Sequence, residues 1–136
     1  MIRIGINGFG RIGRAFFRRV MKAEGVEVVL INDTADTDVL GHLLKYDSVH
    51  GKSDFDVTCS NDSLLVNGKR VSVLHHPSTS FIPWNNHQVD IVIEATGRFL
   101  RADDVSSALS KGVKKIIFSA PPADSTKTIE IGRAHV

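Results

Sequence analysis

Residues 2–14 of the chain read Ile2-Arg3-Ile4-Gly5-Ile6-Asn7-Gly8-Phe9-Gly10-Arg11-Ile12-Gly13-Arg14. Isoleucine alternates with small or polar residues over residues 2–6, which predicts a strand, and the glycines after it predict a tight turn. From Arg11 to about Lys22 apolar residues recur at helical spacing, and Gly25 marks the stop. A second apolar run, Val26 to Ile31, ends at Asn32-Asp33. Together these segments predict a strand, helix and strand of about thirty residues, the length that a parallel crossover requires.

The middle of the chain has a different pattern. We expect a short helix over residues 38–46 and then short strands over 55–59, 64–66 and 70–75. Asn67-Gly68 between the last two strands is a strong two-residue hairpin signal. We interpret residues from about 52 to 80 as a small antiparallel insertion.

Parallel character returns after this insertion. Residues 89–94 and 114–119 are largely apolar, as strands covered on both faces are, and residues 102–111 predict a helix that Gly112 ends. The predicted class is α/β: a doubly wound, mostly parallel sheet (Rossmann) with the antiparallel insertion. We expect ligands at the carboxyl edge of this sheet.

Composition narrows the functional classes. The chain has 136 residues, 42% hydrophobic and 24% charged, which fits one globular domain. A net charge of +2 with dispersed basic residues argues against nucleic acid as a partner. No apolar run approaches the roughly 20 residues that span a bilayer, so no membrane partner is expected. Met1 leads straight into the first strand, and Cys59 is the single cysteine; we therefore expect a cytoplasmic protein without a targeting segment.

The glycine turn predicts a dinucleotide site. Gly8, Gly10 and Gly13 have the spacing of the dinucleotide-binding fingerprint, in which they serve the tight turn, the close approach of the pyrophosphate and the packing of helix on strand. The helix that starts at about Gly10 directs free N–H groups at a diphosphate. Asp33, twenty residues beyond Gly13, can accept hydrogen bonds from the adenosine ribose and repel a 2′-phosphate, so NAD is predicted. The hydroxyl of Thr34 keeps NADP possible.

Five segments of the chain carry a resemblance to a known family. They are Ile6-Asn7-Gly8-Phe9-Gly10-Arg11-Ile12-Gly13-Arg14, Ile31-Asn32-Asp33, His42-Leu43-Leu44-Lys45-Tyr46-Asp47-Ser48-Val49-His50-Gly51, Glu94-Ala95-Thr96-Gly97 and Ser119-Ala120-Pro121. In this order and at these intervals they resemble the phosphorylating glyceraldehyde-3-phosphate dehydrogenases. The resemblance extends from residue 1 to about residue 129.

The resemblance implies a set of cofactor-binding residues. Those at the pyrophosphate and adjoining ribose are Asn7, Gly8, Arg11 and Ile12, beside Gly10 and Gly13 of the fingerprint. Those at the adenine pocket are Thr96, Gly97 and Phe99. Asp33 takes the adenosine ribose, and Ser119 reaches toward the nicotinamide. The chain departs from many relatives, which carry Arg or Lys two positions before Pro77, by having His75 and His76 there. By carrying Thr34 after Asp33, the chain resembles the photosynthetic members of the family, which use both cofactors.

The resemblance also implies an activity for the full-length parent. Glyceraldehyde 3-phosphate is oxidised and phosphorylated to 1,3-bisphosphoglycerate in glycolysis and gluconeogenesis, with a cysteine thiolate as nucleophile and a histidine as base. Those catalytic residues belong to a following domain, so we expect residues 1–129 to be an NAD(P)-binding domain that is inactive alone, from a homotetrameric parent. Cys59 is interpreted as a bystander. We expect no metal site, because two adjacent strand histidines such as His75 and His76 face opposite sides.

Alternatives remain at this point. Residues 130–136 resemble the translation of a sequencing adapter, so we expect a non-native tail there. Erythrose-4-phosphate dehydrogenase shares the fold and mechanism but usually carries Glu where Asp33 stands. A freestanding nucleotide-binding module would make the missing catalytic domain natural, and a nucleic-acid binder would show steeply salt-dependent binding.

Overall fold

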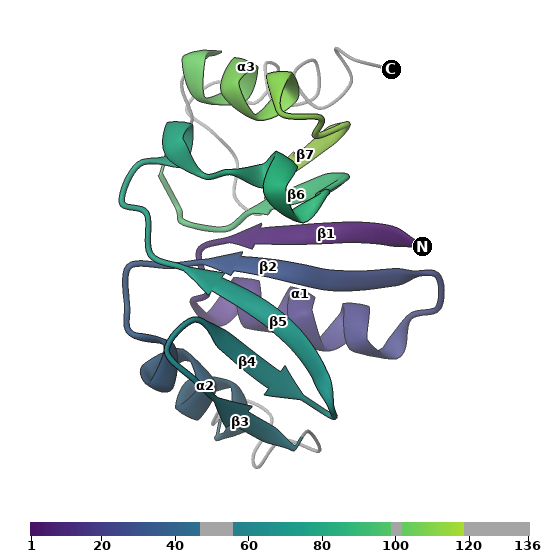
Figure 1. Ribbon diagram of the computed structural model, residues 1–136, viewed down its shortest axis with the longest axis vertical. Helices are drawn as coiled ribbons and strands as arrows, with labels where there is room; N and C mark the ends of the chain where they lie inside the picture. The colour runs from purple at the N-terminus through teal and green to yellow at the C-terminus, as the bar shows by residue number, and fades with distance from the viewer. Residues whose placement is uncertain (47–55, 99–101, 119–136) are drawn as a thin grey trace.

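The computed structural model describes residues 1–46, 56–98 and 102–118 (Figure 1). The strands of this part of the chain form one seven-stranded sheet in the order β3-β4-β5-β2-β1-β6-β7. The parallel strands are β1 (Ile2–Asn7), β2 (Val26–Asn32), β5 (Lys69–Leu74), β6 (Ile91–Glu94) and β7 (Lys115–Phe118). The antiparallel strands are β3 (Val57–Cys59) and β4 (Ser63–Val66). The predicted α/β class and mostly parallel sheet are confirmed.

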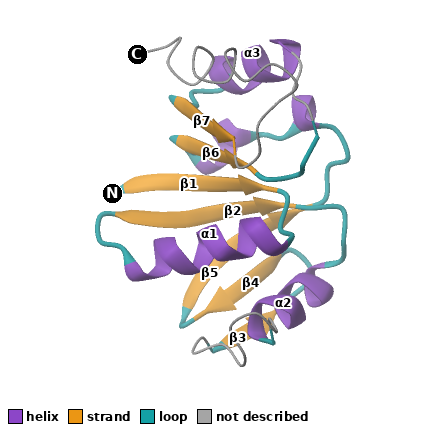
Figure 2. Cartoon of the chain, turned by 180° about the vertical axis from the view of Figure 1, so that it is seen from behind, coloured by secondary structure: helices purple, strands orange, loops and turns teal. Residues whose placement is uncertain are grey.

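Helices cover both faces of this sheet, as the views from front and back show (Figure 2). On one face lie α1 (Arg11–Lys22) and α2 (Thr37–Lys45). On the other lie α3 (Ala102–Ser110) and the two 3₁₀ helices η1 (Thr79–Phe81) and η2 (Trp84–His87). The chain therefore winds in both directions from β1, and the strand order reverses between β1 and β6.

Each face has its own apolar core. The core under α1 and α2 includes Ile4, Ile6, Phe17, Ile31, Leu40 and Leu44. The core on the opposite face includes Leu30, Ile82, Trp84, Val92, Val105 and Ile116. Gly5 separates the two inward isoleucines of β1, and a Cβ there would lie 2.6 Å from Trp84 Cζ3. The alternating residues of β1 thus direct isoleucine side chains into one core, and Gly5 leaves space for the ring of Trp84 in the other.

The insertion is less separate than the sequence suggested. The expected hairpin is present, because β4 and β5 pair antiparallel around Asn67 and Gly68, whose φ angles of 51° and 84° suit a tight two-residue turn. The strand β5, however, pairs with β2 in parallel, so it belongs to the main sheet. The antiparallel insertion expected over about 52–80 thus contains a strand, β5, that also pairs in parallel with β2. Adjacent strands in the chain specify a hairpin locally, whereas the pairing of β5 with β2 depends on contacts between distant segments.

Other predicted boundaries differ only slightly from the structure. Most elements begin or end within one or two residues of expectation, as for α2, which spans Thr37–Lys45 where 38–46 was predicted. The two 3₁₀ helices η1 and η2 were not predicted, because such short turns carry no periodic signal. The part of residues 55–59 that the structure describes as a strand is Val57–Cys59.

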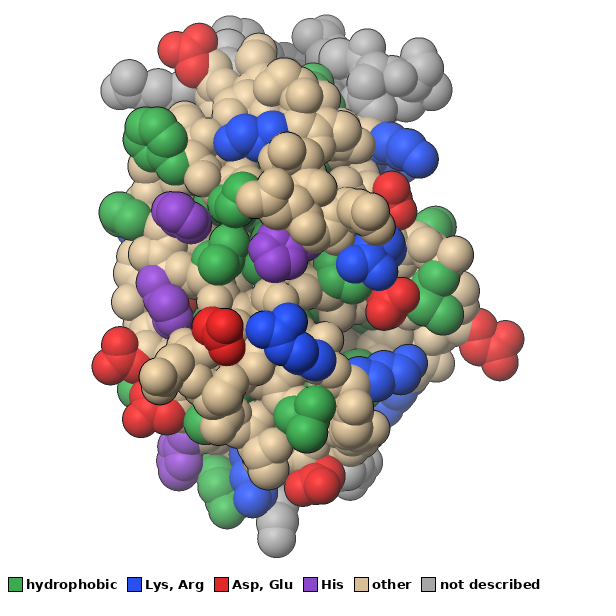
Figure 3. Space-filling model, viewed as in Figure 1, with side chains coloured by type: hydrophobic (Ala, Val, Ile, Leu, Met, Phe, Trp, Pro, Cys, Tyr) green, Lys and Arg blue, Asp and Glu red, His purple; other side chains and the backbone are tan. Residues whose placement is uncertain are grey.

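The described surface is mixed in charge. Acidic and basic side chains are interspersed over the face seen in Figure 3. None of the described helices is long and apolar enough to cross a membrane.

The helix α1 approaches β1 closely at Gly13. A Cβ atom on Gly13 would lie 2.2 Å from the carbonyl oxygen of Gly8 and 3.3 Å from Ile6 Cγ2. A Cβ atom on Gly10, three residues earlier, would meet nothing within 4 Å. Gly10 also has φ −78°, which any residue can adopt. There is therefore no room for a side chain at Gly13, whereas there is room for one at Gly10.

Replacement of Gly13 by alanine should destabilise the fold. Helix propensity alone favours alanine by about 1 kcal/mol, but the clash with a backbone oxygen forces α1 away from the sheet. We expect the unfolding free energy to fall by about 2 kcal/mol in Gly13→Ala and to change by less than about 0.5 kcal/mol in Gly10→Ala. Urea denaturation followed by circular dichroism measures both values. Equal stability of the two variants would contradict the packing argument.

Candidate functional site

A cavity of about 200 Å³ lies where the strand order reverses. It opens at the carboxyl ends of β1, β2 and β6, which parallel pairing brings to the same edge of the sheet. Its lining consists of Asn7, Gly8, Gly10, Asn32, Asp33, Thr34, His76, Pro77, Thr79, Ala95, Thr96 and Arg98. The cavity therefore sits at the position where open α/β sheets bind their ligands.

The glycine turn forms one wall of the cavity. Gly8 has φ +94°, and a Cβ there would lie 2.7 Å from the backbone nitrogen of Thr96, so only glycine fits. The guanidinium of the buried Arg14 donates to the carbonyl oxygen of Phe9 at 3.0 Å. In a trans peptide the N–H points opposite to the carbonyl, so the N–H of Gly10 is directed away from Arg14. The first turn of α1 also leaves N–H groups without helical acceptors.

Asp33 is held against this turn by its own carboxylate. Its Oδ2 atom accepts from the Phe9 N–H at 2.7 Å, and its Oδ1 atom accepts from the Ala35 N–H at 2.9 Å. Its backbone N–H donates to the carbonyl of Leu74 at 3.0 Å. Each carboxylate oxygen has a second lone pair for a further donor. The acid is thus fixed in orientation and retains capacity for hydroxyl groups at the cavity.

Below the cavity an amide relay crosses three strands. The Nδ2 atom of Asn7 donates to Glu94 Oε1 at 2.7 Å and to Thr79 Oγ1 at 3.3 Å. The Oδ1 atom of Asn7 accepts from Asn32 Nδ2 at 3.1 Å, and Asn32 in turn bonds the backbone N–H and carbonyl of His76. Both amide hydrogens of Asn7 are therefore committed inside the protein, and its side chain orients the floor of the cavity.

The start of this relay is a buried carboxyl group. Glu94 is 3% exposed, and its Oε2 atom accepts from the backbone N–H and the hydroxyl of Thr96. Burial raises the pKa of Glu94, while the hydrogen bonds from Thr96 and Asn7 act in the opposite direction. The hydroxyl of Thr96 also accepts from the Arg98 N–H at 3.1 Å. Glu94 therefore ties the ends of β6 and β1 together.

The structure brings some of the predicted cofactor residues together and not others. Those that line the cavity are Asn7, Gly8, Gly10, Asp33 and Thr96. Arg11 and Ile12 are exposed in the first turn of α1, and Gly13 is buried against β1. Gly97 is exposed in a turn with φ +76°. Phe99 and Ser119 lie outside the described residues, as do residues 47–55 and the tail 130–136.

Several lining residues were not predicted as site residues. Asn32 and Ala95 directly end or follow parallel strands, so the carboxyl-edge rule that found Asp33 could have found them. Thr79 and Pro77 carry no such signal, because they belong to the connection that contains η1. His75 and His76 follow the end of β5 at Leu74, so the expectation that they lie on a strand was wrong.

The remaining chemistry-bearing candidates lie elsewhere. Cys59 is exposed on β3, which three strands separate from β1. Among the described residues, no three His, Cys, Asp or Glu side chains are grouped as a metal ion would need.

The buried Glu94 generates a pH prediction. A raised folded-state pKa means that its contribution to stability is fully present below the ordinary value of 4.5 and is lost as the pH rises through the folded value. Gln does not titrate, so the stability difference between the wild type and Glu94→Gln should shrink as the pH rises from about 4 to about 8. Gln also offers one acceptor oxygen instead of two, which should cost about 1–3 kcal/mol. Urea denaturation at a series of pH values measures the difference; a constant value across the series would contradict the prediction.

Known proteins similar to this chain complete the description of the site. Residues 2–102 match the family "Glyceraldehyde 3-phosphate dehydrogenase, NAD binding domain". Glyceraldehyde-3-phosphate dehydrogenase 1 of Bacillus cereus is 45% identical over 135 residues, which are 99% of this chain and 40% of that protein. The glyceraldehyde-3-phosphate dehydrogenases of Priestia megaterium and Geobacillus stearothermophilus are 47% and 46% identical, each over 96% of this chain and 39% of the relative. The chain thus spans about 40% of the length of these relatives and belongs to the glyceraldehyde 3-phosphate dehydrogenase family, in its NAD-binding domain.

Proposed function

We propose that this chain binds NAD in the cavity at the ends of β1, β2 and β6, as the dinucleotide-binding part of a phosphorylating glyceraldehyde-3-phosphate dehydrogenase. One observation carries the proposal. The glycine turn and Asp33 are joined by the hydrogen bond from the Phe9 N–H to Asp33 Oδ2 at 2.7 Å, and both border one cavity. A diphosphate and a ribose that are adjacent in the ligand therefore find their partners side by side.

The pyrophosphate is proposed to lie over Gly10. The space above Gly10 is open, and the free N–H groups of the first turn, at Arg11, Ile12 and Gly13, offer donors and the positive end of the helix dipole. No acidic residue occupies this first turn. An anion is therefore favoured there by backbone groups alone.

The adenosine ribose is proposed to lie at Asp33. The second lone pairs of the carboxylate accept from the two ribose hydroxyls, and the negative charge disfavours a 2′-phosphate. Thr34 lines the cavity with an exposed side chain, which supports NADP as a weaker second ligand. Thr96 and Gly97 are proposed at the adenine with Phe99, and Ser119 toward the nicotinamide.

The whole protein is proposed to oxidise glyceraldehyde 3-phosphate with NAD and to use inorganic phosphate to release the acyl group. In this chain the cavity of about 200 Å³ is smaller than the roughly 300–1,000 Å³ of common ligand sites, so it holds only part of a dinucleotide. The catalytic cysteine and histidine are proposed to lie beyond the sequence that this chain shares with its relatives. A cytoplasmic homotetramer is proposed for the full-length parent.

Asp33→Asn tests the ribose contact. Asparagine removes the charge and leaves one acceptor oxygen for the two backbone N–H groups, so NAD binding should weaken about tenfold. The preference for NAD over NADP should narrow by about fivefold or more, since the repulsion of the 2′-phosphate is removed. Calorimetric titration of the chain with both dinucleotides measures the ratio. Asp38→Asn, at an exposed acid on α2 outside the cavity, is the matched control. An unchanged ratio in Asp33→Asn would refute this placement of the ribose.

Gly10→Ala tests the pyrophosphate contact. The added methyl group enters the open space above the turn without disturbing the fold, so NAD affinity should fall by about tenfold or more while the melting temperature stays near that of the wild type. Calorimetry gives the affinity, and circular dichroism of the same sample gives the melting temperature. Wild-type affinity in Gly10→Ala would mean that the diphosphate lies elsewhere.

A further inference from the structure

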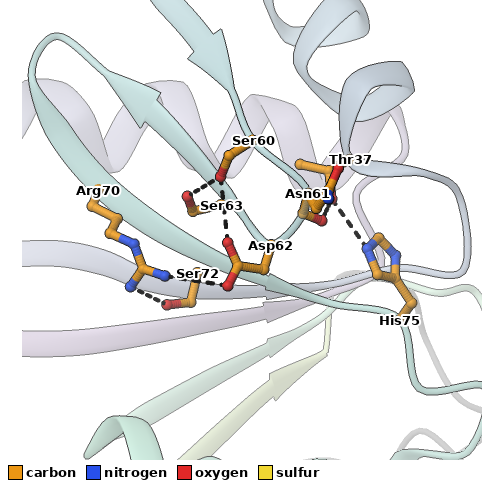
Figure 4. A network of polar contacts seen from close by, with 8 residues as sticks. All are labelled: Thr37, Ser60, Asn61, Asp62, Ser63, Arg70, Ser72 and His75. Carbon is orange, nitrogen blue, oxygen red and sulfur yellow. Dashed lines mark hydrogen bonds and ion pairs between the residues drawn. The ribbon is translucent and has the colours of Figure 1, made fainter.

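A second polar network joins His75 and Thr37 to the turn between β3 and β4 (Figure 4). His75 follows the end of β5, and its Nδ1 atom lies 2.8 Å from the carbonyl oxygen of Asp33. Its Nε2 atom lies 3.1 Å from Thr37 Oγ1, at the start of α2. The hydroxyl of Thr37 donates to the carbonyl oxygen of Asn61, in the β3–β4 turn, at 2.8 Å. The imidazole thus contacts both ends of the segment from Asp33 to Thr37, which is 38 to 42 residues before it in the sequence.

The donors and acceptors around the ring decide which of its protonation forms keeps every contact. The carbonyl oxygen of Asp33 can only accept, so Nδ1 of His75 must carry a proton. While the single hydroxyl hydrogen of Thr37 is used on the carbonyl of Asn61, Oγ1 faces His75 as an acceptor, and Nε2 can bond to it only as a donor. Only the imidazolium form keeps all three contacts at once, those of His75 with Asp33 and Thr37 and that of Thr37 with Asn61.

We propose that His75 is a positioning residue for Asp33, which as an imidazolium holds the Asp33 carbonyl and the Thr37 hydroxyl at once, so that dinucleotide affinity falls when the ring loses a proton to solvent. This inference rests on the proposed function of Asp33. If Nδ1 keeps the remaining proton, the Thr37 hydroxyl turns toward Nε2 and leaves the Asn61 carbonyl. If Nε2 keeps it, the Asp33 carbonyl loses its donor. Either way one link is lost, and so is a positive charge beside the site for an anionic ligand.

The exposure of His75 suits this role. His75 is exposed to solvent, whereas Thr37 is buried with 4% of its surface exposed. The same exposure weakens the electrostatic effect on the ligand through solvent screening. The expected change in affinity is therefore modest, about threefold.

Other charged and titratable groups on the segments around His75 contribute to the same electrostatic field. The segment from β2 into α2 carries Asp33, Asp36 and Asp38. The turn between β3 and β4 carries Asp62, which pairs with Arg70 of β5 at 3.7 Å, both side chains being largely exposed. His76 adjoins His75 in the chain and lines the cavity. Since these groups remain in every variant below, differences between variants isolate His75.

The first experiment tests the network of His75, Thr37 and Asn61 in the absence of ligand. The carbon-13 resonance of the Asn61 carbonyl is followed by NMR in the chain between about pH 5.5 and pH 8, the range in which histidine titrates. It should move with pH in the wild type and stay fixed in His75→Asn, whose amide can replace Nδ1 but does not titrate. It should also stay fixed in Thr37→Val, which keeps the imidazole charge without the hydroxyl, and move again in Thr37→Ser. If the resonance is fixed in the wild type, or moves equally in Thr37→Val, the proposed coupling from His75 through Thr37 to Asn61 is wrong.

The second experiment reads the consequence for the ligand. The dissociation constant of NAD, measured by calorimetry, should rise about threefold from pH 5.5 to pH 8 in the wild type and rise less in His75→Asn, which keeps His76 at the cavity. His42→Asn, at an exposed histidine on α2 whose ring lies 4.9 Å from that of Tyr46, should retain the wild-type profile. Identical profiles in the wild type and His75→Asn overturn the inference and leave the proposed function standing. Absence of NAD binding at every pH overturns the proposed function, and the Asn61 resonance then still tests the coupling from His75 through Thr37 to Asn61.

Discussion

The contact between Gly13 and the carbonyl oxygen of Gly8 controls the geometry of this molecule. It lets α1 lie directly on β1, with the first turn of the helix at the carboxyl edge of the sheet. A helix displaced by even one methyl group would carry its N-terminal N–H groups away from the cavity. The site for an anion therefore depends on a packing contact in the core. Gly13, which does not line the cavity, has the strictest steric requirement of the turn.

Around this contact the polar groups divide into those that are fully committed and those that retain capacity. Asn7 and Asn32 are buried, and their amide hydrogens are used on groups within the protein, so they stiffen the floor of the cavity. Asp33 accepts one backbone N–H on each oxygen and can accept more. This division agrees with general experience that buried polar networks are stable when every member is satisfied. Rigidity below and free lone pairs above are what a preorganised binding site needs.

The sequence predicted the parts of this arrangement that depend on neighbours in the chain. The glycine turn, the strand before it and the Asn67-Gly68 hairpin each carry their signal within a few residues. The parallel pairing of β5 with β2 could not be predicted in the same way, because it joins segments about forty residues apart and competes with the local hairpin. The relay through Asn7 was likewise invisible, because its partners Glu94 and Thr79 come close only when β6 and η1 are in place.

Asp33 and Glu94 show why residue type alone does not assign a role. Each is an acid at or just beyond the carboxyl end of a parallel strand, and the rule that singles out Asp33 applies to Glu94 as well. Their surroundings differ: Asp33 is half-buried with two backbone donors, whereas Glu94 is 3% exposed and receives a backbone N–H, an amide and a hydroxyl. Burial makes a full negative charge costly at Glu94 and therefore raises its pKa. An acid that accepts ligand hydroxyls must keep its charge and its lone pairs near solvent, so the physics of burial places the ligand contact at Asp33 and leaves Glu94 to hold the strands together.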